Sequence, residues 1–537
     1  MKKILALSLV LMMVLALVLT GCGGSGNQTT TTAAAATTAA AAGEKTTAAA
    51  TTAAPADETV VLQWYARQGT DNDWAMVEEA YNEKFLEDIN ATVEWHNFSN
   101  ADYDQKATAA MSAQQPMDVV FTSAAQLRFL TWQKAGAFMP LNDLLKEYAA
   151  ETLAAIPQYV WDGASVAGEI YGMPTYKDMS VDMGFIYNKT LAQDLGVEEK
   201  ILNSGYTYGR DLDAIFYEAK ELRDAKYPDW ANIYLISHRQ DMHIYYHADT
   251  LTSIATAAID GSFKNDGELA EGKKIFNVYA TNEYADAIKL ITRWVDDNIF
   301  PFDAQNADPE GALKKTGASL GNFTWGLAVP NVNQYEAFEQ GLIHPTHSFT
   351  YTGYIQAVMN AIASHSENPE KAMQALNLMF SDPIYSTMWR FGVEGTHWNA
   401  VEQDGVTRAD FTGTKNDVPN KSDRPFYYWY HAELGNLFTC YLPTDLDGAF
   451  FTELEKMNEN AIASYYMGFV ADTTPVENEV AAVAGVVAEY HDTLKFGMTP
   501  NVDEMIAAFN EKLNANGAEK IVAEVQTQAD AWAAENK

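Results

Sequence analysis

The eight residues TVVLQWYA at positions 59–66 are rich in β-branched and aromatic side chains, which favour a β-strand. Residues 73–89, DWAMVEEAYNEKFLEDI, follow with apolar side chains at helical spacing. A second strand is predicted at 91–98 (ATVEWHNF), a second helix at 102–113 and a third strand at 117–124 (MDVVFTSA). Strands that alternate with helices predict a parallel sheet in an α/β fold.

Ligands of parallel α/β sheets bind beyond the carboxyl ends of the strands. This rule places Trp64, Tyr65, Arg67 and the pair Thr122–Ser123 near a cleft. Neighbouring residues of a strand point to opposite faces, so we expect only one of Trp64 and Tyr65 to face a ligand and the other to be core. Asp118 is interpreted as a strand-start residue.

The N-terminal segment has the pattern of an export signal. Lys2 and Lys3 precede an apolar run that is slightly short for a spanning helix. Leu19-Thr20-Gly21-Cys22 then resembles the lipobox of bacterial lipoproteins, which implies a signal peptide at 1–21 and a lipid anchor on Cys22. The alternatives are a chance cysteine behind an ordinary signal, or an uncleaved anchor.

Residues 23–56 consist almost entirely of Gly, Thr and Ala and lack large apolar side chains. Such a composition cannot offset the entropy of ordering, so 22–56 is predicted to be a disordered linker with a reach of about 30 Å. O-glycosylation of its threonines stays open. Residues 57–537 are too many for one ordinary core, so at least two lobes are expected.

The chain carries 35 Lys and Arg against 72 Asp and Glu, a formal charge of −37. This charge argues against nucleic acid as a partner and makes a neutral ligand easier to accommodate. Only Cys22 and Cys440 are present, so with Cys22 acylated no internal disulfide is expected. Cys440 is predicted to be a buried thiol.

The enzyme motifs HExxH, GxxxxGK[ST] and CxxC are absent from the sequence. The chain has so many Asp and Glu residues that pairs of carboxylates arise by chance. Such a pair therefore does not indicate a glycosidase active site. His238, His243 and His247 lie close together, but without the helical spacing to a glutamate or a cysteine partner that a zinc site would favour. The sequence DLDG at 445–448 lacks the glutamate that a calcium loop needs at its twelfth position. Neither metal nor cofactor is therefore expected.

Several segments resemble, in order, those of family 1 extracellular solute-binding lipoproteins, the sugar-binding components of ABC importers with the plan of maltodextrin-binding protein. The matching segments are 168–196 (GEIYGMPTYKDMSVDMGFIYNKTLAQDLG), 317–327 (GASLGNFTWGL) and 360–383 (NAIASHSENPEKAMQALNLMFSDP). Residues 271–301, 391–398 (FGVEGTHW) and 472–497 resemble a subgroup with an extra C-terminal segment.

The resemblance implies a two-lobed, periplasmic-binding-protein-like (type II) α/β fold with a hinge and a helical C-terminal extension. Lobe 1 would comprise 57–177 and about 350–395, and lobe 2 about 178–349 and 396–537. The protein would be a monomeric receptor, not an enzyme, on the outer face of the bacterial cytoplasmic membrane. It would capture an oligosaccharide by lobe closure and deliver it to permease subunits. A receptor for peptides or other solutes, and a surface glycan-cleaving enzyme, are the alternatives.

Sugars pack their C–H faces on aromatic rings and need hydrogen-bond partners for their hydroxyls. Trp325 matches the family's binding tryptophan and is the preferred platform, with a core role as the alternative. Tyr176 and Asp178 follow the crossing at Pro174, where a hinge contact is equally expected. Further predicted contacts, with core or corner roles as their alternatives, are Trp64, Tyr65, Arg67, Glu394, His397 and Trp398.

Overall fold

The computed structural model divides into Met1–Ala56 and a compact unit, Asp57–Lys537. It describes residues 58–67, 73–236, 245–263, 267–301, 317–325, 339–419, 423–428 and 433–537. The predicted signal peptide, Cys22 and the linker lie outside this range. Within it, no helix is long and apolar enough to cross a membrane.

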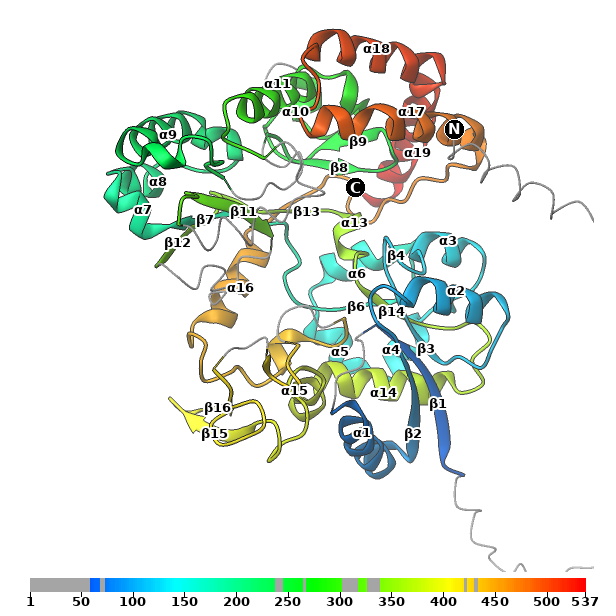
Figure 1. Cartoon of the computed structure of the whole chain (residues 1–537). Helices are drawn as coiled ribbons and strands as arrows, with labels where there is room; N and C mark the ends of the chain where they lie inside the picture. Colours follow the sequence, from blue (N-terminus) through cyan, green and yellow to red (C-terminus); the bar gives the residue numbers. More distant parts are fainter. Residues whose placement is uncertain are drawn as a thin grey trace, which may run out of the picture. The chain divides into compact units, whose positions relative to one another are not determined.

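The first sheet has the strand order β2-β1-β3-β14-β6 (Figure 1). Its strands are β1 (Val60–Ala66), β2 (Ala91–Asn97), β3 (Val119–Thr122), β14 (Met359–Ile362) and β6 (Met173–Pro174). Strand β1 runs parallel to both β2 and β3, as the sequence predicts, whereas β14 is antiparallel to β3 and β6. A late segment of the chain therefore completes the sheet that the first residues begin.

Helices pack around this sheet over an aromatic core. They are α1 (Trp74–Ile89), α2 (Tyr103–Ser112), α3 (Phe129–Lys134), α4 (Asn142–Tyr148), α5 (Ala150–Ala155), α6 (Gln158–Ala164), α14 (Pro369–Ser381) and α15 (Pro383–Phe391). The Trp64 ring stacks on Trp95 at 4.8 Å, and Trp95 lies 5.4 Å from Trp389 of α15. The first core thus joins residues 62–179 to residues 355–389.

The second sheet, β11-β7-β12, is antiparallel and consists of β11 (Gly321–Trp325), β7 (Met183–Asn188) and β12 (Gln340–Ile343). Gly341 must lack a side chain because the Tyr187 ring occupies the place of a Cβ atom. Phe185 and Phe323 pack on Phe216 and Trp294. The flanking helices are α7 (Lys189–Asp194), α8 (Glu198–Leu202), α9 (Asp213–Lys226) and α11 (Asn282–Asp296).

The C-terminal helices complete a third core and do not form a separate body. They are α17 (Glu477–Lys495), α18 (Val502–Ala515) and α19 (Ala518–Asn536), which confirms the predicted helical C-terminal region (Figure 1). Their apolar faces pack against the sheet β10-β9-β8, formed by β10 (Ile275–Asn277), β9 (Ala255–Ala258) and β8 (Ala248–Thr250). Tyr284 and Ile288 of α11 belong to this core, whereas Ile291 and Trp294 of the same helix belong to the second. Helix α11 therefore unites both cores in one lobe.

A fourth core surrounds Phe391, Trp398 and Phe450, and it includes Cys440, whose thiol is buried as predicted. It involves β16 (Val406–Asp410), which pairs with β15 (Asn399–Gln403), and α16 (Phe450–Glu459). Ile384 and Phe438 contact both this core and the first. Residues 396–454 thus pack beside lobe 1, and the predicted lobe borders stay a prediction. The short elements are β4 (Ser165–Val166), β5 (Glu169–Ile170), α10 (Gly267–Ala270), β13 (Phe349–Thr350), α13 (Thr352–Ile355) and β17 (Ile462–Ala463).

Asp249 of β8 makes the stability of this fold depend on pH. Burial raises the pKa of Asp249 from 3.8 to about 7, although a hydrogen bond from Ser464 Oγ, 2.5 Å from Oδ2, opposes the shift. The folded state therefore holds this proton more tightly than the unfolded chain, and stability is lost as pH rises from about 4 through 7. At pH 8 the Asp249→Asn variant should have a free energy of unfolding up to about 4 kcal/mol higher than wild type. It should therefore unfold at a higher temperature.

At pH 5 the same substitution should change the melting temperature much less, because wild-type Asp249 is then protonated. Asp404→Asn, which alters an exposed carboxylate in the β15–β16 turn, provides the control at both pH values. An equal loss of stability at pH 5 and pH 8 would contradict the prediction.

Candidate functional site

The chain passes from the first core to the second between Pro174 and Met183, and returns after β12. The two connections lie side by side, since the Val181 amide donates to the Phe349 carbonyl at 2.6 Å. Asp178 and Asp182 stand on the first connection and are both almost fully buried. Polar groups of both lobes therefore meet at this crossing.

A cavity of about 490 Å³ opens beside the second connection, within the size range of small-ligand sites. Asp182, His344, His347, Phe450 and Glu453 contribute to its lining, and Lys456 and Asn460 of the α16 region complete its polar part. It thus combines an aromatic ring with charged groups of both signs, the mixture expected of a site for an amphipathic solute.

Asp182 is the most informative residue of the cavity. Its Oδ2 atom lies 2.9 Å from His344 Nδ1, whereas Oδ1 is buried and has no hydrogen-bond partner among the described residues. Burial lowers the pKa of His344, but the hydrogen bond and the charge of Asp182 outweigh burial, so that the pKa is raised. An unpaired carboxylate oxygen is costly to bury, and Oδ1 itself is not open to solvent in this structure.

A second polar group lies at the carboxyl end of β1. Arg67 forms an ion pair with Glu433 and donates to Gln126 Oε1 at 2.7 Å and to Asn100 Oδ1 at 2.9 Å. The Arg67 guanidinium also lies 4.7 Å from the centre of the Phe121 ring. Arg67, which follows β1, is thus held by residues that follow β2 and β3 and by Glu433, which lies in a loop much later in the chain (the late loop).

The late loop joins this group to the crossing. The Tyr176 amide donates to the Gly435 carbonyl at 3.1 Å, and the Leu437 amide donates to the Tyr176 carbonyl at 2.8 Å. Burial raises the pKa of Glu433, against the charges of Arg67 and Lys177. Lys177 itself pairs with Asp178, so a chain of compensated charges runs from β1 to the crossing.

Tyr354 continues this chain on the side of the returning connection. Its hydroxyl donates to Asp178 Oδ2 at 3.1 Å. Burial raises the pKa of Tyr354 well above its usual value, and the charges of Asp178 and Asp182 add to the shift. The structure thus brings together three of the predicted residues, Arg67, Tyr176 and Asp178, with Asp182 nearby.

The structure does not place Trp64 and Tyr65 in the cavity lining. Trp64 is fully buried in the first core, and Tyr65 is 4% exposed with its ring stacked on His96 at 4.3 Å. Strand β1 is central in a sheet whose two faces are both covered, so alternation turns one side chain to each buried face and neither to a cleft.

The predicted group at 394–398 proves to be a structural corner. His397 is fully buried, with Nε2 3.0 Å from Asp73 Oδ2, and the Trp398 indole donates to the Gly392 carbonyl at 2.7 Å. His397 and Trp398 therefore do not face the cavity, and the alternative role is the correct one. Glu394 is exposed and does not line the cavity.

Trp325 stays a prediction, because only its backbone is described. It ends β11 opposite Met183 of β7, and Met183 directly follows Asp182. The backbone of Trp325 is thus at the strand end nearest the crossing. His238 and His243 lie outside the described residues.

The residues that sequence reasoning missed are Asp182, His344, Phe450 and Glu433. Asp182 could in principle have been predicted from the sequence, since it directly precedes the predicted strand at 183–187. The other three reach the site from segments far along the chain, and no local pattern marks them.

Comparison with known proteins agrees with this architecture. Residues 79–395 match the family model of bacterial extracellular solute-binding proteins, and residues 465–534 match a domain of unknown function (DUF3502). A carbohydrate ABC transporter substrate-binding protein of Streptococcus pneumoniae serotype 4 is 22% identical over 486 residues, which cover 88% of this chain and 91% of that protein.

Solved structures show the same fold. The N-glycan transport solute-binding protein of Streptococcus pneumoniae superposes with a TM-score of 0.73 at 20% identity, covering 89% of this chain and 100% of the other. An HMO-binding, ABC-transporter-associated solute-binding protein from Bifidobacterium longum infantis superposes with a TM-score of 0.59 at 16% identity, covering 89% of this chain and 100% of the other. The expected two-lobed α/β fold is confirmed, and the match over 79–395 shows that the chain belongs to the bacterial extracellular solute-binding protein family.

Proposed function

We propose that this protein is the oligosaccharide receptor of an ABC importer, and that its ligand binds at the crossing between the lobes. The observation that carries the proposal is Asp182, a residue of the cavity lining whose buried Oδ1 has no hydrogen-bond partner among the described residues and would gain one if opening of the lobes exposed it to a ligand. A sugar hydroxyl is a donor of the right kind, and hydrogen bonds to charged groups are the stronger ones. The named function of the pneumococcal relative supports the same class of ligand.

The charges at the crossing favour an uncharged ligand. Arg67 is paired with Glu433, Lys177 with Asp178, and Asp182 with His344. Because these charges are already paired, a charged ligand would gain little from them, whereas hydroxyls can use the remaining donor and acceptor positions. Trp325 is proposed as an aromatic platform at the edge of this site.

We further propose that the protein acts without catalysis, as a monomer that presents its closed form to permease subunits. A ligand that contacts both lobes stabilises the closed arrangement by its preference for that arrangement. Two acyl chains on Cys22 would hold the protein at the outer face of the cytoplasmic membrane, since one chain alone binds only marginally.

The proposed function is tested by mixing the full-length chain with a panel of neutral oligosaccharides. The bound ligand should raise the melting temperature, with a stabilisation of about 2.7 kcal/mol at a hundredfold excess over Kd. Chromatography should recover the sugar unchanged. Released smaller sugars would identify a glycan-cleaving enzyme instead, and stabilisation by peptides alone would identify a receptor for another solute.

Asp182→Asn should weaken oligosaccharide binding by about 10- to 100-fold, because it removes a charge-assisted hydrogen bond of about 1.5–3 kcal/mol. Isothermal titration calorimetry measures the change. Asp73→Asn is the matched control, since Asp73 also pairs with a histidine, His397, at 3.0 Å, but outside the cavity lining. If the control loses affinity and Asp182→Asn does not, the site lies at the 394–398 corner.

Cys22→Ser should release the protein from membranes into the soluble fraction, because serine cannot accept the thioether-linked lipid. Cell fractionation followed by immunoblotting measures the distribution, and Cys440→Ser provides the control for loss of a thiol. Retention of the Cys22→Ser protein in the membrane fraction would contradict lipid anchoring.

A further inference from the structure

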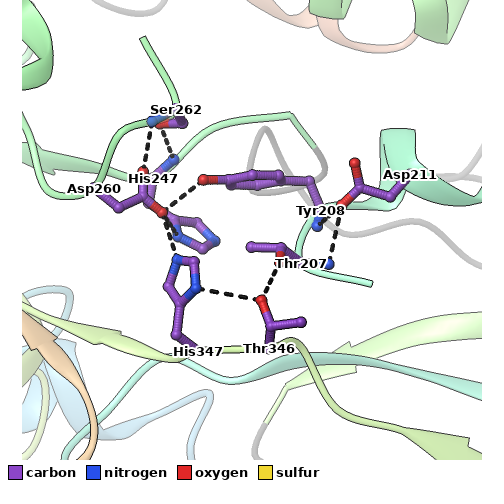
Figure 2. A network of polar contacts seen from close by, with 8 residues as sticks. All are labelled: Thr207, Tyr208, Asp211, His247, Asp260, Ser262, Thr346 and His347. Carbon is purple, nitrogen blue, oxygen red and sulfur yellow. Dashed lines mark hydrogen bonds and ion pairs between the residues drawn. The ribbon is translucent and has the colours of Figure 1, made fainter. Parts of the chain in front are cut away.

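Two histidines and an aspartate converge beside the second connection, where His347 also lines the cavity of about 490 Å³ (Figure 2). His247 directly precedes β8, Asp260 follows β9, and His347 precedes β13. Asp260 Oδ2 lies 2.6 Å from His247 Nδ1 and 2.9 Å from His347 Nε2. One donor atom from each of the three residues lies within 4.8 Å of the others. Segments that are almost a hundred residues apart thus place three metal-ligating side chains together.

We propose that His247, Asp260 and His347 bind a zinc ion. Two imidazole nitrogens and one carboxylate oxygen form a donor set that zinc accepts with three protein ligands and a water as the fourth. Zinc–nitrogen and zinc–oxygen bonds of about 2.0–2.2 Å require tetrahedral ligand atoms to lie about 3.3 Å apart. Side-chain shifts of less than about 1 Å would open the present contacts of Asp260 to that spacing. Nitrogen donors argue against calcium and magnesium, which prefer oxygen.

The surroundings of these ligands already hold them in orientation. The Ser262 amide donates to Asp260 Oδ1 at 3.0 Å, which leaves Oδ2 directed at the two imidazoles. His347 Nδ1 lies 3.3 Å from the Thr346 hydroxyl, and the His247 ring stacks on Phe349 at 4.1 Å. Partners of this kind fix ring orientation in metal sites, where the nitrogen that does not bind the metal is usually hydrogen-bonded.

Asp260 Oδ2 is crowded in a way that a cation would relieve. Besides the two imidazole nitrogens, the Tyr208 hydroxyl lies 2.6 Å from the same oxygen. A carboxylate oxygen offers two in-plane lone pairs, so three close donors compete for it. With zinc bound, each imidazole would direct a lone pair at the ion instead of a proton at Oδ2, and Tyr208 would keep the oxygen as its hydrogen-bond partner.

An ion can reach the three ligands from solvent. His347 is about a third exposed and lines the cavity of about 490 Å³. Tyr208 and Ser262 line a second, polar cavity of about 580 Å³ that also contains Glu283 and Asp286. The surplus of acidic groups in the chain further favours the approach of a cation.

A bound ion would cross-link two segments of the chain beside the crossing. It would connect β8 and β9 of the third sheet to the segment that leads into Phe349, the residue paired with Val181. Because this connection is absent from the unfolded chain, zinc binding would add to the stability of the fold.

The test uses the full-length chain, treated with EDTA, dialysed and titrated with zinc sulfate at pH 7.5 by isothermal titration calorimetry. We expect one zinc per chain and a higher melting temperature, and X-ray absorption should show a shell of nitrogen and oxygen ligands. His347→Gln and Asp260→Asn should each weaken zinc binding at least about tenfold. His365→Gln, which alters a histidine near the Gln115 carbonyl, should leave zinc binding unchanged.

Melting temperatures of the metal-free variants show whether each still folds, and His347→Gln is the milder change because His347 is partly exposed. Absence of zinc binding by the folded wild type would overturn the proposal. Equal affinity in wild type and in both ligand variants would overturn it as well, and so would binding of calcium in place of zinc. The outcome does not depend on the proposed sugar, which is absent from every titration.

Discussion

The pairing of Val181 with Phe349 is the contact on which the arrangement of the candidate site depends. It holds the outgoing and the returning connection together at the point where one lobe ends and the other begins. Asp178 and Asp182 stand on one connection, and His344 and His347 stand on the other. The pairing of Ile343 with Phe185 and the contact of His344 Nδ1 with Asp182 Oδ2 help to hold both sets together. Groups separated by more than 160 positions in sequence therefore become one polar site.

Burial of these polar groups is tolerated because almost every charge has a partner. Arg67 and Glu433 neutralise each other, as do Lys177 and Asp178, and an isolated charge in the same position would cost several kcal/mol. The unpaired Oδ1 atom of Asp182 departs from this pattern. Several buried polar atoms lack a partner among the described residues, and this oxygen draws attention because Asp182 also lines the cavity.

The spacing and composition of neighbouring residues were sufficient to predict the fold, but not the residues of the candidate site. The strand at 59–66 and the two strands that follow it can be predicted, because the spacing of apolar side chains and the residue composition are properties of neighbouring residues. The same logic did not place Trp64 and Tyr65, because β1 is central in a sheet that is covered on both faces and both side chains are buried. Glu433 and Phe450 reach the site through tertiary packing, and no property of their own segments distinguishes them from other loop and helix residues.

One short segment carries three different roles, and their proximity has a thermodynamic consequence. His344 and His347 both line the proposed sugar cavity, His347 also belongs to the proposed zinc site, and Phe349 pairs across the crossing. An ion that restrains His347 also restrains the backbone that positions His344 and Phe349. If this restraint favours the closed lobes, zinc raises the affinity for the solute, and by linkage the solute raises the affinity for zinc by the same factor. A restraint that is equal in open and closed forms would stabilise the fold and leave binding of the solute unchanged, because only a differential interaction shifts an equilibrium.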